Sequence, residues 1–419
     1  MKRARSFTLL FLGLLLLIPP GCDDDDPVKV DDPTDDEVSP EAFTQRIAET
    51  NDLAFALYHH LSPTFDNLMI SPHSIAVAFG SAYAGARGST EEEMADALRF
   101  PYPQARLHST LRALNDTLMS RGEGQDSSAF RLKIANSCWG DEHWHYERAY
   151  LDTLTRCYGA PIQYVDFMSQ SEEARQEINQ WVADQTENRV LELLPEGVLD
   201  SGTTLVLANT VYFRASWLMQ FKPEYTRDKD FLRLDGSIVS VPIMGGMAPF
   251  PYYDGDGYRA VELPYVGEQV SMIAVMPDSG EFVAFESGFD ADCFQTVLGQ
   301  LEETFIDIDF PRFAFDTPLD LVQTLKDMDM TEAFAPGANF TGIDGTDDGE
   351  PWIDGVWHKT FISVDEYGTE AAAGTGIEVY CAIIPSFSGD RPFLFVIYDR
   401  PTGTILFLGR VLDPTSSGV

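Results

Sequence analysis

The sequence predicts a single α+β domain of unusual size, with helices gathered in its first half and strands in its second. Apolar residues recur at helical spacing within 43–61, 107–118 and 174–181. From residue 204 onward the pattern changes to short apolar or alternating runs that are typical of strands. Because no internal repeat or linker divides the chain after residue 41, one folded domain is expected over 41–414, followed by a tail at 415–419.

The helical segments each place apolar side chains on one face, which is therefore expected to be buried. The residues are Phe43, Ile47, Ala54, Leu57 and Leu61, then Leu107, Leu111, Leu114 and Leu118, then Ala174, Ile178 and Trp181. The expected strands are TLVLANTVYF (204–213), RAVELPYV (259–266), QVSMIAVMP (269–277), FIDIDFPRF (305–313), FLFVIYD (393–399) and TILFLGRVL (404–412). Pro-Thr-Gly at 401–403 predicts a hairpin turn between the last two.

Residues 1–22 are interpreted as an export signal and not as part of the fold. Basic residues precede an apolar run at 7–18 that is too short for a comfortable membrane span. The run ends at Gly21-Cys22, which resembles a bacterial lipoprotein cleavage site with Cys22 as the lipid-modified residue. Pro19 and Pro20 depart from the usual pattern, so ordinary signal cleavage is the alternative. Residues 23–40 predict an acidic, disordered tether. The protein is thus expected to be exported to the cell envelope or the extracellular space and anchored to a membrane through Cys22.

The charge balance and the motifs exclude several functions. Lys and Arg number 28 against 67 Asp and Glu, and the resulting net charge of −39 disfavours nucleic acid as a partner. The chain lacks a phosphate-binding glycine loop, a nucleophile elbow and a paired-histidine zinc helix. The acidic run at 344–350 lacks the glutamate that would complete a calcium loop, because Gly355 stands in its place. His143 and His145 flank Trp144 at strand-like spacing, and a surface loop is favoured there over a metal role. No catalysis, cofactor or metal is therefore expected.

Four cysteines follow Cys22, namely Cys138, Cys157, Cys293 and Cys381, and their spacing matches no metal motif. Two interpretations remain open. A bridge between Cys138 and Cys157 is compatible with an exported protein. Isolated buried thiols are the other interpretation.

A family resemblance rests on six stretches in order along the chain. They are NLMISPHSIAVAF (67–79), LANTVYFRASWLMQF (207–221), VELPY (261–265), ANFTGI (338–343), HKTFISVDEYGTEAAAGTG (358–376), and RPFLFVIYDRPTGTILFLGRVLDP (391–414), which holds the last two expected strands. On these stretches the chain resembles a serpin over about residues 43–414.

The resemblance implies three β-sheets, eight to nine helices and an exposed reactive-centre loop. It implies that a target serine protease attacks the loop and forms a covalent acyl-enzyme, after which the loop inserts into the central sheet; the partner is that protease, and the inhibitor is a monomer. By the same resemblance, Ser71, Ser74, Asn209 and His358 correspond to the polar cluster that gates the sheet, and Trp217 to the point where insertion starts. Arg99, Arg106 and Arg112 occupy positions where some relatives bind heparin, but three arginines on so acidic a protein predict a solvated face.

The hinge residues that the resemblance assigns are Glu366, Gly368, Thr369, Glu370, Ala371, Ala372 and Ala373. From Thr369 to Tyr380 the chain alternates. One parity holds Thr369, Ala371, Ala373, Thr375, Ile377 and Val379, and the other holds Glu370, Ala372, Gly374, Gly376, Glu378 and Tyr380. The first set is small or apolar, and the second contains both charged residues, Glu370 and Glu378. This is the pattern of a half-buried strand. Small, uncharged inward residues are what a strand entering a closed sheet requires.

The resemblance also assigns the reactive bond. Counting from Glu366 as the first residue, the seventeenth is Ala382, so the bond is expected at Ala382–Ile383, with Cys381 as the alternative if the register slips. A small Ala suits the shallow apolar pocket of elastase-like or subtilisin-like proteases and offers no cation to a trypsin-like one. The competing hypotheses are a non-inhibitory serpin that serves as a binding module or a simple substrate, and a structural or adhesive lipoprotein.

Overall fold

A six-stranded sheet crosses the protein in the computed structural model, which describes residues 38–62, 66–101, 103–122, 130–159, 161–346, 351–369 and 384–416. All of them belong to one unit, which spans 37–419. The strand order is β10-β11-β4-β2-β3, with β12 also paired to β4. These strands are β10 (Phe313–Asp320), β11 (Ile353–Val364), β4 (Leu205–Ser216), β2 (Phe130–Asp141), β3 (Gln163–Val165) and β12 (Gly368–Thr369).

The remaining strands form a second, nine-stranded sheet in which β5 pairs with β6 beside the order β1-β15-β14-β8-β7-β6-β9-β13. They are β1 (Leu68–Ile70), β5 (Arg227–Leu232), β6 (Ile238–Gly255), β7 (Tyr258–Pro264), β8 (Val270–Pro277), β9 (Glu302–Pro311), β13 (Ser386–Ser388), β14 (Phe393–Asp399) and β15 (Thr404–Val411). The described strands thus form two hydrogen-bonded sheets where three were expected. The reason is β6, which pairs with β5 and β9 along most of its length and with β7 at its end, and so joins two sheets into one.

Ten α-helices lie within the described residues, against eight to nine expected. They are α1 (Pro40–Leu61), α2 (Pro72–Tyr83), α3 (Gly88–Ala97), α4 (Gln104–Met119), α5 (Arg148–Thr153), α6 (Phe167–Gln185), α7 (Phe282–Ser287), α8 (Ala291–Gln300), α9 (Val322–Asp327) and α10 (Thr341–Asp344). The excess comes from short pieces such as α10, which has 4 residues. None of the helices in the described ranges has the length and apolarity that a membrane crossing requires.

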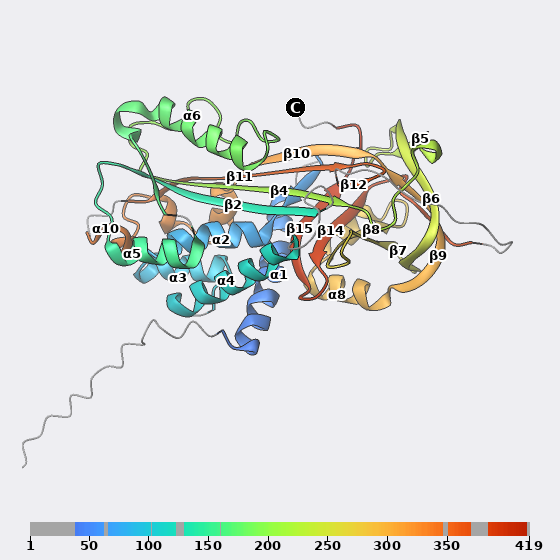
Figure 1. Cartoon of the computed structure of the whole chain (residues 1–419), viewed down its shortest axis with the longest axis horizontal. Coiled ribbons are helices and arrows are strands. Elements are labelled where there is room, and N and C mark those ends of the chain that lie inside the picture. The colour runs from blue at the N-terminus through green and yellow to red at the C-terminus, as the bar shows by residue number, and fades with distance from the viewer. Residues whose placement is uncertain are drawn as a thin grey trace, which may run out of the picture. The chain divides into compact units, whose positions relative to one another are not determined.

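The helices divide between the two faces of the six-stranded sheet (Figure 1). Helix α6 lies on one face, while α1 to α5 lie on the other. Under α6, a small apolar cluster joins Phe167, Ile178 and Val182 of the helix to Val206 of β4 and Trp357 of β11. The opposite face of the sheet packs into the two larger apolar clusters, which also include α1, α2 and the second sheet.

The helices expected at 43–61, 107–118 and 174–181 are confirmed as α1, α4 and α6, and the turn at 401–403 joins β14 to β15. Two expectations were wrong. The first half also contains β2 and the second half also contains α7 to α10, so helices and strands are less segregated than expected. The run at 305–313 crosses from β9 into β10, because Arg312 belongs to neither strand.

Candidate functional site

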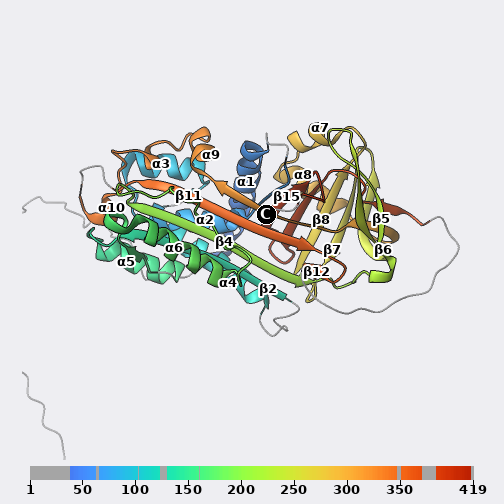
Figure 2. The ribbon, with the colours of Figure 1, turned by 90° about the horizontal axis from the view of Figure 1, so that it is seen from above.

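The pairing of β11 with β4 runs through the middle of the six-stranded sheet. The two strands pair in parallel, from Ile353 opposite Leu205 to Thr360 opposite Val211, and we call this pairing the seam. Beyond it the strands part. Among the residues that the structure describes, the far end of β11 has ladder partners only in β10, while Ala215 of β4 pairs with β12. Strand β12 runs antiparallel to β4 and also contacts β11, so the hinge begins to fill the space between the two strands (Figure 2).

A row of polar side chains, all buried except the half-buried Asn136, crosses the middle of the seam. His358 of β11 lies opposite Asn209 of β4, which in turn lies opposite Asn136 of β2. Beneath them is the start of α2, with Ser71 as its N-cap residue and Ser74 in its first turn. We call these five residues the seam row.

The hydrogen bonds of the seam row determine the state of His358. Its Nε2 accepts from the backbone N–H of Ser71 at 3.1 Å, and its Nδ1–H therefore donates to Asn209 Oδ1. The side-chain amide of Asn209 donates to the carbonyl of Ser74 at 3.0 Å and also contacts Ser74 Oγ and Asn136 Oδ1. Burial lowers the pKa of His358 to about 3, so its imidazole is neutral at physiological pH. The hydrogen bond between His358 and Asn209 crosses the seam, so it holds only while β11 and β4 stay together.

A second cluster lies where β12 begins, and we call Trp217, Tyr265, Gly368 and Thr369 the hinge cluster. Thr369 is 1% exposed, and its hydroxyl is 3.1 Å from the hydroxyl of Tyr265. Tyr265 stacks on Trp217 with ring centroids 4.6 Å apart. The Trp217 indole N–H donates to the carbonyl of Asp365 at 3.0 Å. The inward orientation predicted for Thr369 is therefore confirmed.

Two further residues shape the turn into β12. Gly368 has φ +147°, and a Cβ there would overlap the backbone of Ala215 and Ser216, so the position requires glycine. Glu366 is buried, where its carboxylate accepts from Thr226 Oγ1 at 2.6 Å and its carbonyl accepts from the Phe221 N–H at 2.9 Å. These contacts hold the chain that leads into β12 in place, near the point where β4 and β11 part.

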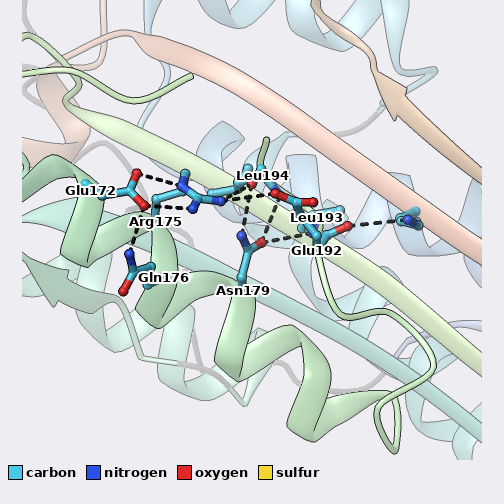
Figure 3. A network of polar contacts seen from close by, with 8 residues as sticks. Glu172, Arg175, Gln176, Asn179, Glu192, Leu193 and Leu194 are labelled. Carbon is cyan, nitrogen blue, oxygen red and sulfur yellow. Dashed lines mark hydrogen bonds and ion pairs between the residues drawn. The ribbon is translucent and has the colours of Figure 1, made fainter. Parts of the chain in front are cut away.

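Helix α6 covers the seam from the other face. Trp357 and Ala208 are partners across it, and both pack in the apolar cluster under α6. Figure 3 shows how Arg175 and Asn179 of the helix bind the segment 192–194, with Arg175 donating to the Leu194 carbonyl at 2.7 Å. Lys359 of β11, in turn, lies 3.4 Å from the Glu192 carbonyl. Opening the seam would therefore disturb the packing under α6.

The structure brings together Ser71, Ser74, Asn209 and His358, whereas Trp217 lies in the separate hinge cluster. Sequence reasoning missed Asn136 and Tyr265, and only strand register could have revealed them. Several predicted residues lie outside the described ones: Cys22, Glu370, Ala371, Ala372, Ala373, Ala382 and Ile383.

Two remaining expectations concern cysteines and arginines. Cys138 and Cys157 are both buried and are not bonded to each other, so the interpretation as a bridge was wrong and that of buried thiols is confirmed for this pair. Arg99, Arg106 and Arg112 are exposed, and Arg112 pairs with Asp116 one helical turn away at 3.6 Å.

We expect His358 to make the domain sensitive to acid. The pKa of His358 is about 3 in the folded state, below the unfolded value of 6.5. The stability that the neutral, buried imidazole gives the folded state is therefore fully present above pH 6.5, and it is lost progressively as the pH falls toward 3. Between pH 6 and 5 the free energy of unfolding should fall more steeply in the wild type than in His358→Gln. The expected difference between the two slopes is about 1 kcal/mol per pH unit. Denaturant unfolding at several pH values measures these slopes. His145→Gln, at a side chain 76% exposed, is the control, and an unchanged slope in His358→Gln would contradict the assignment.

Comparison with known proteins agrees with this geometry. The family model described as "Serpin (serine protease inhibitor)" matches residues 48–414. Leukocyte elastase inhibitor of Sus scrofa is 36% identical over 360 residues, covering 83% of this chain and 93% of the relative. An uncharacterised serpin-like protein of Thermococcus kodakarensis is also 36% identical, over 370 residues, covering 87% of this chain and 84% of the relative.

A solved structure extends the likeness to three dimensions. The native state of the thermophilic serpin tengpin superposes with a TM-score of 0.79 and 25% identity, covering 90% of this chain and 95% of tengpin. The family model alone covers most of the chain, and the relatives and the fold agree with it. The chain belongs to the serpin family.

Proposed function

We propose that this serpin inhibits serine endopeptidases by trapping them: the protease cleaves the reactive loop, and the loop then inserts into the seam. The observation that carries the proposal is the position of β12. Its two residues already pair antiparallel to β4 and contact β11, with the small Thr369 buried between them. The first step of strand insertion is therefore built into the uncleaved protein.

The register of β12 supports insertion of the residues that follow. Thr369 lies opposite Ala215, so continuing the ladder would set Ala371 opposite Phe213 and Ala373 opposite Val211. Residues directly opposite in an antiparallel pair point to the same face. Ala215, Phe213 and Val211 all belong to the buried apolar core, so the small parity of the loop would enter that core.

The same register would set Thr375 opposite Asn209 of the seam row. Parting β11 from β4 breaks the bond between His358 and Asn209, and an unpaired buried polar group costs about 1–3 kcal/mol. A threonine hydroxyl can both donate and accept, so Thr375 would restore hydrogen bonds to the separated pair. Gly376 would lie opposite Ala208, beneath α6, where the absence of a side chain limits the disturbance of the helix.

The trap requires a covalent step on the loop. The catalytic serine of the protease attacks the carbonyl carbon of Ala382, the Ala382–Ile383 bond breaks, and Ile383 leaves as a free amine, which gives an acyl-enzyme. Insertion then carries the attached protease along the sheet before water hydrolyses the ester. The likeness to the leukocyte elastase inhibitor and the small Ala382 both favour elastase-like or subtilisin-like targets.

We further propose that the protein acts outside the cytoplasm, held to a membrane by acylation of Cys22. The support is the order of the N-terminal segments: basic residues, an apolar run, Gly21-Cys22 and an acidic stretch. Like charges on the stretch 23–37 and on an anionic lipid surface would repel each other, which would hold the inhibitory domain away from the membrane.

Thr369→Arg should convert the inhibitor into a substrate. The long cation would have to enter a fully buried position, at a cost of several kcal/mol, so insertion would lag behind hydrolysis of the acyl-enzyme. Incubation with an elastase-type protease and denaturing gel electrophoresis measure the fraction in covalent complex. Glu370→Lys, on the outward parity, is the control and should still trap the protease. If Thr369→Arg still forms an SDS-stable complex at wild-type stoichiometry, the inference drawn from the alternation is wrong. If the wild-type protein is cleaved without trapping the protease, the non-inhibitory alternative is favoured.

The reactive bond can be located by mass spectrometry. We expect the peptide released from the denatured complex to begin at Ile383, with strong inhibition of elastase- or subtilisin-type proteases and little of trypsin. A peptide beginning at Cys381 or Ala382 would refute the assigned bond.

Cys22→Ala should release the protein from membranes while its inhibitory domain stays active. Fractionation of expressing cells, followed by titration with protease, tests both parts. Recovery of the wild-type protein as a soluble, unmodified species would argue for ordinary secretion instead.

A further inference from the structure

Three potential metal ligands converge where β2 ends and α6 begins, away from the seam row and the hinge cluster. Asp141 is the last residue of β2, His143 follows it, and Asp166 is the N-cap of α6. One ligand atom from each residue lies within 4.8 Å of the other two. His143 Nδ1 is 2.8 Å from Asp141 Oδ1 and 4.0 Å from Asp166 Oδ1. A single imidazole nitrogen thus faces two carboxylates.

Backbone hydrogen bonds hold both carboxylates in place. Asp141 is buried, and its Oδ2 accepts from the N–H groups of Phe167 and Met168 at 2.9 and 3.2 Å. Asp166 Oδ1 accepts from the N–H of Ser169 at 2.8 Å. These bonds orient the carboxylates without occupying all their lone pairs, which is the preparation that metal-binding carboxylates usually have.

The electrostatics of the cluster favour a cation. The start of a helix contributes roughly half a positive charge, which is outweighed by the two full charges of Asp141 and Asp166. Within the described residues, His143 is the ion-pair partner of both carboxylates. The two carboxylates therefore leave a net negative charge beside His143 Nδ1, and that charge attracts a cation.

We propose that Asp141, His143 and Asp166 bind a divalent first-row transition metal ion, with Zn²⁺ as the representative, through Asp141 Oδ1, His143 Nδ1 and Asp166 Oδ1. One imidazole nitrogen and two carboxylate oxygens suit such ions, whereas Mg²⁺ and Ca²⁺ prefer oxygen ligands alone. The metal takes the place of the Nδ1 proton, which passes to solvent. The His143 side chain is 46% exposed, so its ring can rotate to close the distance to Asp166, and water can complete the coordination.

Occupation of this site would tie the end of β2 to the first turn of α6. That helix covers the seam, with Ile178 and Val182 packed over Trp357. In the metal-free protein, hydrogen bonds and apolar packing connect the sheet to α6. The bound ion would add a further link between them. Because the metal binds the folded arrangement, it should also raise the melting temperature, by an amount that grows with the logarithm of the ratio of metal concentration to dissociation constant.

The test is a titration of the whole protein with Zn²⁺ by calorimetry and with Co²⁺ by visible absorption. We expect one ion per chain in the wild type, at least about tenfold weaker binding in His143→Gln and in Asp166→Asn, and wild-type binding in His145→Gln. His145 is the matched control, since it lies two residues away and pairs with Glu147 at 3.6 Å and not with either aspartate.

Thermal unfolding provides a second readout that does not depend on protease inhibition. Zn²⁺ should raise the melting temperature of the wild type and of His145→Gln but not of His143→Gln. Absence of binding to the wild type at millimolar metal, unchanged binding in His143→Gln, or loss of binding in His145→Gln would each overturn the proposal.

Discussion

The parallel pairing of β11 with β4 is the constraint on which the rest of the structure depends. Parallel ladders are slightly less stable per residue than antiparallel ones. In this seam, moreover, the centre is occupied by His358 and Asn209, which hold the strands together through hydrogen bonds. A strand that ran antiparallel to both neighbours, as β12 already does on β4, would replace one parallel pairing with two antiparallel ones. The sheet is closed, yet its topology leaves room for a more stable arrangement.

The surroundings of the seam explain how it stays closed. On one face the start of α2 binds the seam row, and on the other α6 packs over Trp357 and Ala208. An inserted strand would move those two residues apart by about one strand spacing, roughly 4.8 Å. Both layers would then lose contacts before a new ladder had formed. The packing on the two faces therefore opposes opening of the seam.

Much of the fold followed from the sequence, because α1, α4, α6 and the core strands have strong periodicity of their own. The burial of Thr369 also followed from the alternation of the hinge. The contacts of the seam row and the hinge cluster did not. Asn136 meets Asn209 through strand register, and Tyr265 meets Thr369 across 104 residues. No local sequence pattern predicts such long-range contacts. The sequence also did not predict that β6 joins two of the expected sheets. The residues of one strand do not indicate how many other strands it pairs with.

The positions of Cys138 and Cys157 bear on how the sheet could open. Cys138 is in β2, in the part of the sheet that lies on the β4 side of the seam, and Cys157 follows α5. Burial raises the pKa of the Cys138 thiol to about 12, which keeps it in the unreactive form. A covalent link between these two cysteines would fasten β2 to the helical layer and resist any sliding of β2, β4 and β3 as a block. Within the described residues Cys138 and Cys157 are not joined to each other, so no such link fastens β2 to the helical layer.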